Sequence, residues 1–148
     1  RSTGEKQDLC IDAIKASLPD LYHFVDSVIV PDDVDALIEA MESFADNPEI
    51  DLIWTSGGTG FSARDNTPEA TKAVIQKETP GLSEAIRLFS KEKTDHWMLS
   101  RAVSGICNNS LIINLPGSPK AVKESIEAVL PALGHGLEIM TGTFTQHE

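Results

Sequence analysis

The chain has 148 residues, a length that fits one domain with a buried core over residues 1–148. Its formal net charge of −11 argues against binding to nucleic acids or to an anionic membrane surface. No apolar run approaches the ~18 residues of a membrane-spanning helix, and the two cysteines lack metal-binding spacing. We therefore expect a cytosolic (cytoplasmic) protein with reduced thiols and no membrane insertion.

The first half of the chain alternates helical and strand-like patterns. Apolar residues at helical spacing predict helices, and short β-branched or apolar runs predict strands. In chain order these are a helix at 7–17, a strand at 24–30, a helix ending near residue 45 and a strand at 52–55. Asp32 or Asp33 can cap the second helix.

The second half continues the alternation. In chain order the predictions are a helix at 67–77, a helix at 82–90, a less regular stretch at 97–106, a hairpin turn at 108–109, a strand at 110–114, a helix at 120–130 and a last helix opened by Pro131. Strands that alternate with helices indicate an α/β fold, in which a mostly parallel sheet has helices on both faces.

One element of such a sheet is missing from this pattern. A doubly wound sheet needs a central strand before the helix at 7–17, and no strand pattern precedes that helix. We therefore expect that the chain is a fragment or that residues preceding Arg1 are not represented.

A glycine-rich loop follows the strand at 52–55. Gly57, Gly58, Thr59 and Gly60 carry little side-chain bulk, so their backbone N–H groups can approach an anion closely. Asp65 follows at the rim, where a carboxylate can bind the divalent cation that accompanies a nucleotide. The alternative is a plain tight turn, and the loop matches neither a P-loop nor a dinucleotide-binding motif.

The Thr67-Pro68 pair is a capping signal in front of the next helix, and Thr67 is also a candidate binding residue.

A second loop of similar character follows the strand at 110–114. Pro116, Gly117 and Ser118 precede a helix, and the carboxyl ends of parallel strands meet at one sheet edge. The two loops are therefore expected to face each other across a crevice, although each could be only a turn.

Asp32 should reach the same edge of the sheet, because it follows the strand predicted at 24–30. Together with Asp65 it predicts a site for Mg²⁺, unless it serves only as a helix cap. Ser100 and Arg101 could add a hydroxyl and a guanidinium, and Arg64 could neutralise phosphate charge. Each of these side chains could equally have a structural or solvent-exposed role.

Four segments in the same order resemble the molybdopterin adenylyltransferases, which include bacterial Mog-type enzymes and the G domains of the plant enzyme and gephyrin. The segments are TSGGTGFSARDNTPEAT at 55–71, ETPG at 78–81, MLSR at 98–101 and LIINLPGS at 111–118. The resemblance covers essentially the whole chain. It implies a three-layer α/β/α fold of the Mog-like, molybdopterin-binding type, usually assembled as a homotrimer, with the first strand of the family absent here.

The resemblance also implies an activity: Mg²⁺-dependent transfer of AMP from ATP to the terminal phosphate of molybdopterin, with release of pyrophosphate. Asp65 and Asp32 match the family's acids, residues 57–60 match the loop that holds the nucleotide and pterin phosphates, and residues 116–118 match the second binding loop. Thr67 is a further candidate residue for binding the nucleotide or molybdopterin. Fusion to, or partnership with, a molybdenum-insertase domain occurs in the family. A gephyrin-like trimeric scaffold and a catalytically weak molybdopterin-binding domain are the alternative functions, and the fold alone does not separate them.

Overall fold

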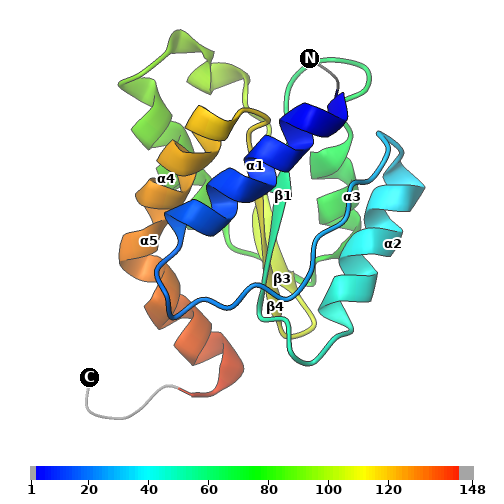
Figure 1. The fold of residues 1–148 in the computed structure, drawn as a ribbon, viewed down its shortest axis with the longest axis vertical. Coiled ribbons are helices and arrows are strands. Elements are labelled where there is room, and N and C mark those ends of the chain that lie inside the picture. The colour runs from blue at the N-terminus through cyan, green and yellow to red at the C-terminus, as the bar shows by residue number, and fades with distance from the viewer. Residues whose placement is uncertain (1–2, 144–148) are drawn as a thin grey trace.

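Helices and strands alternate along residues 3–143, which are the residues that the computed structural model describes (Figure 1). In chain order the elements are α1 (Thr3–Ser17), α2 (Val34–Ala45), β1 (Leu52–Ser56), α3 (Thr67–Val74), β2 (Lys77–Glu78), α4 (Pro80–Lys91), the 3-10 helix η1 (Asp95–Leu99), β3 (Ser104–Cys107), β4 (Ser110–Leu115) and α5 (Pro119–Thr141). No helix in this part of the chain combines the length and the apolar character needed to cross a bilayer.

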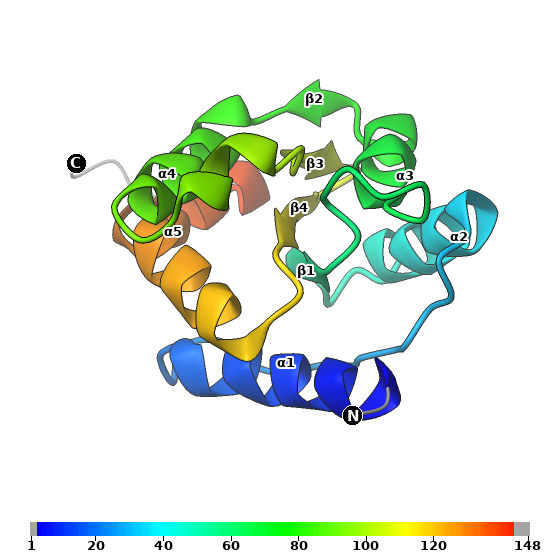
Figure 2. The same ribbon diagram turned by 90° about the horizontal axis from the view of Figure 1, so that it is seen from above.

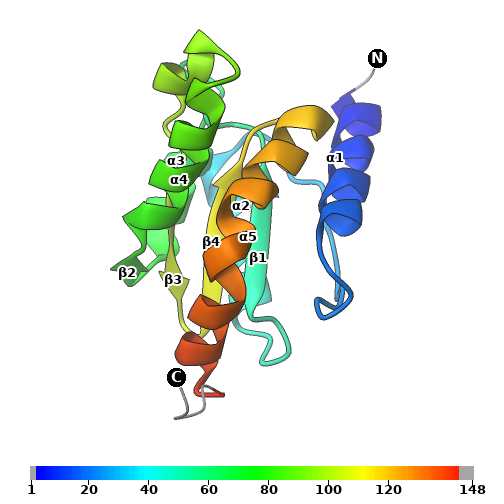
Figure 3. The ribbon, with the colours of Figure 1, turned by 90° about the vertical axis from the view of Figure 1, so that its left-hand side faces the viewer.

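The helices cover both faces of the sheet, which confirms the expected α/β/α layering (Figures 2 and 3). Two separate apolar clusters fill the two interfaces. One joins α1, α4 and α5 to the sheet around Ile113, Leu115 and Ile126, and the other joins α2 and α3 to it around Met41 and Ile112. Burial of these side chains supplies the main driving force for the layering.

The sheet is mixed, and the expectation of a mostly parallel sheet was wrong in this respect. Its order is β1-β4-β3-β2; β1 and β4 are parallel, whereas β4–β3 and β3–β2 are antiparallel. The predicted turn at 108–109 explains this outcome, because a two-residue connection necessarily reverses the chain. Asn108 adopts a φ of 56°, the left-handed conformation that asparagine tolerates in such turns.

The central strand β4 is buried along its whole length. Leu111, Ile113 and Leu115 alternate with Ile112, so that successive side chains enter the two opposite clusters. Parallel pairing aligns Ser56 of β1 with Leu115 of β4, and both strands therefore end at the same sheet edge. This register brings the two loops that follow these strands next to each other.

Residues 24–30 do not form the predicted strand. They run as an irregular segment past the outer side of β1, and no backbone hydrogen bond within residues 3–143 joins them to another segment. A strand requires a paired neighbour, and β-branched composition alone does not supply one. β1 consequently lies at the sheet edge on that side.

Two predicted helix boundaries also differ from the structure. Pro131 lies inside the continuous helix α5 instead of opening a new helix. Val129 and Leu133 are fully buried on either side of it, and their packing outweighs the hydrogen bond that a proline removes. Helix α3 ends at Val74 and not at residue 77, because β2 pairs with β3 immediately afterwards.

Candidate functional site

The glycine-rich loop leaves β1 through two left-handed residues. Gly57 and Gly58 have φ values of +92° and +72°, which favour glycine over other residues. A Cβ atom on Gly58 would overlap the hydroxyl of Thr67, and the Thr67 N–H donates to the Gly58 carbonyl at 3.1 Å. The loop therefore folds back onto the start of α3, with no room for a side chain at residue 58.

The second loop lies directly against the first. The Gly57 N–H donates to the Leu115 carbonyl at 2.9 Å, and the Ser56 hydroxyl donates to the Pro116 carbonyl at 2.9 Å. A Cβ atom on Gly117 would come within 3.3 Å of the Gly57 Cα. The structure thus brings the two loops together, as the parallel pairing of β1 and β4 requires.

Several N–H groups of these loops have no protein partner. Within residues 3–143, the backbone N–H groups of Gly58, Thr59 and Gly60 donate no hydrogen bond. Ser118 caps α5, because its hydroxyl accepts from the Ala121 N–H at 3.3 Å. The loops therefore offer free donors beside a helix amino terminus, an arrangement suited to phosphate oxygens.

Asp65 is held at the rim of the glycine-rich loop by a tight turn. Its carboxylate oxygen Oδ2 accepts from the Ser62 N–H at 2.8 Å, and its own N–H donates to the Ser62 carbonyl at 3.0 Å. The same oxygen lies 3.0 Å from the position a Cβ would take on Gly60. A larger residue at position 60 would therefore push the carboxylate away from the loop.

Asp32 lies next to the segment that carries Asp65. The Arg64 guanidinium contacts the Asp32 carboxylate at 3.3 Å, and the Asn66 side chain donates to the Asp32 carbonyl at 3.4 Å. The helix cap predicted for Asp32 or Asp33 is provided by Asp33, whose carboxylate accepts from the Ala36 N–H at 2.9 Å. Asp32 is therefore free of the capping role, although no strand delivers it to this edge.

Thr67 does not cap α3 as predicted. The cap is Asn66, which makes no side-chain capping bond, and Thr67 is the first helical residue. The Thr67 carbonyl accepts from the buried Thr71 hydroxyl at 2.8 Å. Thr67 therefore shapes the loop through its contact with Gly58 and through its backbone.

Arg101 reaches the glycine-rich loop from the other side, whereas the Ser100 hydroxyl accepts from the Ala102 N–H at 3.3 Å. The Arg101 N–H donates to the Thr59 carbonyl at 2.8 Å, and its guanidinium donates to the carbonyls of Gly60 and Asp65, both at 2.7 Å. The guanidinium also pairs with Glu69 at 2.6 Å. This pairing lowers the pKa of Glu69 and raises the pKa of Arg101.

Asn114 holds together the segments from which the two loops emerge, a role that the sequence patterns did not reveal. It is fully buried, and its amide donates to the hydroxyls of Thr55 at 2.9 Å and Thr71 at 3.0 Å. Its side-chain oxygen accepts from the Val103 N–H at 3.0 Å. The signal was available, since an asparagine at the end of the apolar run 110–114 needs polar partners once buried.

Asp32 and Asp65 by themselves supply too few ligands to hold a magnesium ion. Within residues 3–143 no group of three or more His, Cys, Asp or Glu side chains could hold a metal. Mg²⁺ is, however, commonly bound through one or two carboxylates together with substrate phosphates and waters. Asp32 and Asp65 fit this pattern if a phosphate ligand supplies the remaining oxygens.

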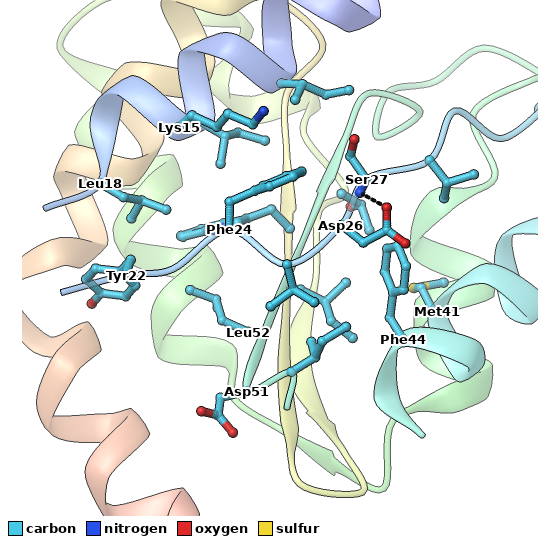
Figure 4. A pocket seen from close by; sticks show the side chains of 18 of the residues that line it. Lys15, Leu18, Tyr22, Phe24, Asp26, Ser27, Met41, Phe44, Asp51 and Leu52 are labelled. Atoms are coloured by element: carbon cyan, nitrogen blue, oxygen red, sulfur yellow. Dashed lines mark hydrogen bonds between the residues drawn. The ribbon is translucent and has the colours of Figure 1, made fainter. Parts of the chain in front are cut away.

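One sizeable cavity lies mainly away from the two loops. It is a groove of about 1070 Å³ between α1, residues 24–30 and the free side of β1, here called the α1–β1 groove. Leu18, Phe24, Leu52 and Phe44 surround it (Figure 4), and one end reaches Ser56. Because its walls are mainly apolar, this groove offers less to a phosphate than the free N–H groups of the loops do.

Comparisons with known proteins agree with the resemblance seen in the sequence. Residues 2–135 match a family described as "Probable molybdopterin binding domain". The chain is 40% identical over 151 residues to the molybdopterin adenylyltransferase of Helicobacter pylori (strain J99), covering 98% of this chain and 84% of that protein. It is also 40% identical over 112 residues to gephyrin of Dictyostelium discoideum, covering 76% of this chain but only 16% of gephyrin.

Solved structures give the same result. The fold is similar to that of the molybdopterin biosynthesis enzyme MoaB from Thermus thermophilus, with a TM-score of 0.86 and 44% identity over 94% of this chain and 88% of that one. The chain therefore belongs to the molybdopterin-binding domain family that includes the molybdopterin adenylyltransferases.

Proposed function

We propose that this protein acts in molybdenum cofactor biosynthesis as a molybdopterin adenylyltransferase. The reaction transfers AMP from ATP to the terminal phosphate of molybdopterin. An oxygen of that phosphate attacks the α-phosphorus of ATP, the bond from this phosphorus to the β-bridging oxygen breaks, and pyrophosphate leaves. The substrate supplies its own nucleophile, so the protein needs no catalytic serine or cysteine.

The observation that carries the proposal is the pair of facing loops with free donors and an adjacent acid. The N–H groups of Gly58, Thr59 and Gly60 have no partner within residues 3–143, so they can donate to phosphate oxygens. The loop of Pro116, Gly117 and Ser118 closes the opposite side. The two loops together can orient two phosphorylated substrates toward each other.

Asp65 and Asp32 are the residues that would hold Mg²⁺ in this site. When bound, the ion would neutralise phosphate charge during the transfer. Asp65 lies at the rim of the glycine-rich loop, and Arg64 and Asn66 bind Asp32 from the adjacent positions. The Ser100 hydroxyl lies one residue before Arg101, whose N–H binds the loop, so it is proposed as a further substrate contact.

Calorimetric titration with ATP, with and without Mg²⁺, tests this function. We expect Mg²⁺-dependent binding, and in Asp65→Ala a loss of AMP transfer to molybdopterin on the order of 100-fold or more. Asp35→Asn is the matched control, because Asp35 is an exposed acid in the first turn of α2 outside the site. If the folded protein neither binds ATP nor transfers AMP, the proposed function is wrong.

The proposal also covers the oligomeric state of the protein and its location in the cell. Leu88 and Met98, on α4 and η1, are 61% and 63% exposed, and large exposed apolar side chains often mark an interface. We propose that they contribute to a homotrimer in the cytosol, with fusion to or partnership with a molybdenum-insertase domain as in multidomain relatives. Light scattering of the purified protein tests this, because a monomeric mass at high concentration would exclude the trimer.

A further inference from the structure

The guanidinium of Arg101 binds three different parts of the glycine-rich loop region at once. Its Nε donates to the Gly60 carbonyl at 2.7 Å, and one terminal nitrogen donates to the Asp65 carbonyl at 2.7 Å. Both terminal nitrogens contact the Glu69 carboxylate, at 2.6 and 3.4 Å. These contacts use four of the five N–H groups that an arginine has.

These contacts fix the distance between the two ends of the segment 60–65. The segment has no helix or strand, and its own hydrogen bonds are confined to the turn between Ser62 and Asp65. A planar guanidinium that binds the carbonyls at both ends holds them in one rigid geometry. Because Asp65 is the last residue of this segment, the position of its carboxylate depends on Arg101.

Glu69 anchors the guanidinium to helix α3. It lies in the first turn of α3, and its side chain is 50% exposed, whereas that of Arg101 is 33% exposed. The Arg101 backbone N–H also binds the Thr59 carbonyl at 2.8 Å, so main chain and side chain act on the same loop. The contacts therefore join the segment that follows η1, the glycine-rich loop and α3 into one unit.

The same contacts distinguish Arg101 from a cation that binds phosphate directly. Arg64, the other arginine at this edge, is 81% exposed and makes one side-chain contact, to Asp32 at 3.3 Å. The Arg101 guanidinium is occupied by protein acceptors, and a phosphate would have to displace one of them. Arg101 therefore contributes to the site by holding the loop in place and not by offering a free positive charge to a phosphate.

We infer that Arg101, anchored by Glu69, is a positioning residue that sets the place of the Asp65 carboxylate relative to the loop donors. This inference rests on the proposed function, since it assigns a task to the loop in Mg²⁺ and ATP binding. Groups that orient a metal ligand typically change metal affinity or activity by about 10–100-fold when they are replaced.

The test compares Arg101→Lys with the wild-type chain. Lysine keeps the charge but cannot bind two carbonyls and a carboxylate in one plane. We expect the half-saturating Mg²⁺ concentration for ATP binding to rise about 10–100-fold, with a smaller change in ATP affinity at saturating Mg²⁺. Arg87→Lys is the matched control and should leave the Mg²⁺ dependence unchanged, because Arg87 lies on α4 outside the site and its hydrogen bond to the Ala102 carbonyl at 2.9 Å can be made by lysine.

Hydrogen exchange of the unliganded protein provides a second measurement. The hydrogen-bonded amides of Ser62, Arg64 and Asp65 should exchange faster in Arg101→Lys and in Glu69→Gln, while those of β4 stay protected. Glu69→Gln covers the case in which Arg101→Lys does not fold, because Glu69 is half exposed and tolerates replacement. An unchanged Mg²⁺ dependence together with unchanged exchange would overturn the inference.

The two failures can be told apart. If the wild-type chain neither binds ATP with Mg²⁺ nor transfers AMP, the proposed function fails, whatever the exchange data show. If the wild type is active and Arg101→Lys has the same Mg²⁺ dependence, only the role of Arg101 fails. A lower melting temperature without a shift in Mg²⁺ dependence would show that Arg101 is merely structural, which also overturns the inference.

Discussion

The polar groups of β1 are completely paired on one side of the strand and left open on the other. On the inner side, β1 pairs with β4 along five residues, and Thr55 joins the network of Asn114. On the outer side, the strand faces the α1–β1 groove, and no strand pairs with it within residues 3–143. The indole N–H of Trp54 is buried there without a hydrogen-bond partner.

The difference shows where this fold is rigid. Loops that follow paired strands are held in place by those strands. A site for phosphorylated substrates needs such rigidly placed loops. The segment 24–30 lacks such support; Phe24 and Val28 are each 56% exposed, and the Lys15 ammonium lies 3.9 Å from the centre of the Phe24 ring. Substitutions on the inner side should therefore cost far more stability than substitutions along the groove.

Replacement of Asn114 should have the largest effect on stability. Asn114→Ala removes the partner of the partly buried Thr55 hydroxyl and of the Val103 N–H, and one of the partners of the buried Thr71 hydroxyl; each unpaired buried group costs about 1–3 kcal/mol. We expect a loss of about 3 kcal/mol or more in the free energy of unfolding, measured by urea denaturation. Asn109→Ala, an exposed turn residue, should stay within about 0.5 kcal/mol. Equal effects at the two asparagines would refute the role of the network.

A side chain at Gly58 should have the next largest effect. Gly58→Ala places a methyl group against the Thr67 hydroxyl at a φ of +72°, so we expect a loss of about 1–3 kcal/mol together with weaker ATP binding. Gly136→Ala is the control: it lies inside α5 with nothing within 4 Å and should stabilise the protein by up to about 1 kcal/mol. Thermal melts and calorimetry would measure both. Unimpaired stability and ATP binding in Gly58→Ala would contradict the tight loop.

The contact between Glu69 and Arg101 should weaken in acid. The pKa of Glu69 is lowered below its ordinary value of 4.5, first by the hydrogen bond from Arg101. A carboxyl with a lowered pKa in the folded state stabilises the fold above its ordinary pKa, and this contribution is lost as pH falls through the lowered value. Exchange of the Ser62, Arg64 and Asp65 amides should therefore accelerate as the pH falls below 4.5, after correction for intrinsic rates. In Glu69→Gln this acceleration should be absent; its persistence would assign the effect to another group.

Substitutions in the groove should have the smallest effect. Val28→Ser and Ile29→Ser alter side chains that are 56% and 48% exposed, so each should change stability by no more than about 0.5 kcal/mol. Urea denaturation of these two variants and of Asn114→Ala compares their losses in the free energy of unfolding directly. A loss above about 1 kcal/mol in either variant would show that the segment 24–30 is packed as firmly as the inner side of β1.

Much of the candidate site could be predicted from local patterns. Gly57, Gly58 and Gly117 stand where two apolar runs turn into helices, and the ends of parallel strands share an edge. Two features escaped prediction because they depend on contacts between distant segments. Asn114 meets Thr71 across 43 residues, and Arg101 meets Gly60 across 41 residues. Local spacing carries no information about such partners.

The proposed compartment rests partly on the thiols, which the tertiary structure places apart. Cys10 belongs to the cluster that joins α1, α4 and α5 to the sheet, and Cys107 belongs to the cluster on the other face. Both are buried and free, and the sheet separates them. Burial also raises the pKa of Cys107, which keeps this thiol protonated and unreactive.

The sequence by itself determined the α/β class, the order of most helices, the turn at 108–109 and the two loops, because these follow from hydrophobic period and from glycine and proline chemistry. Only the tertiary structure decided the mixed direction of the sheet, the irregular course of residues 24–30 and the continuity of α5 through Pro131. The physical reason is common to all three. Pairing and burial are properties of neighbours in space, and they override local preference wherever a strand finds or lacks a partner.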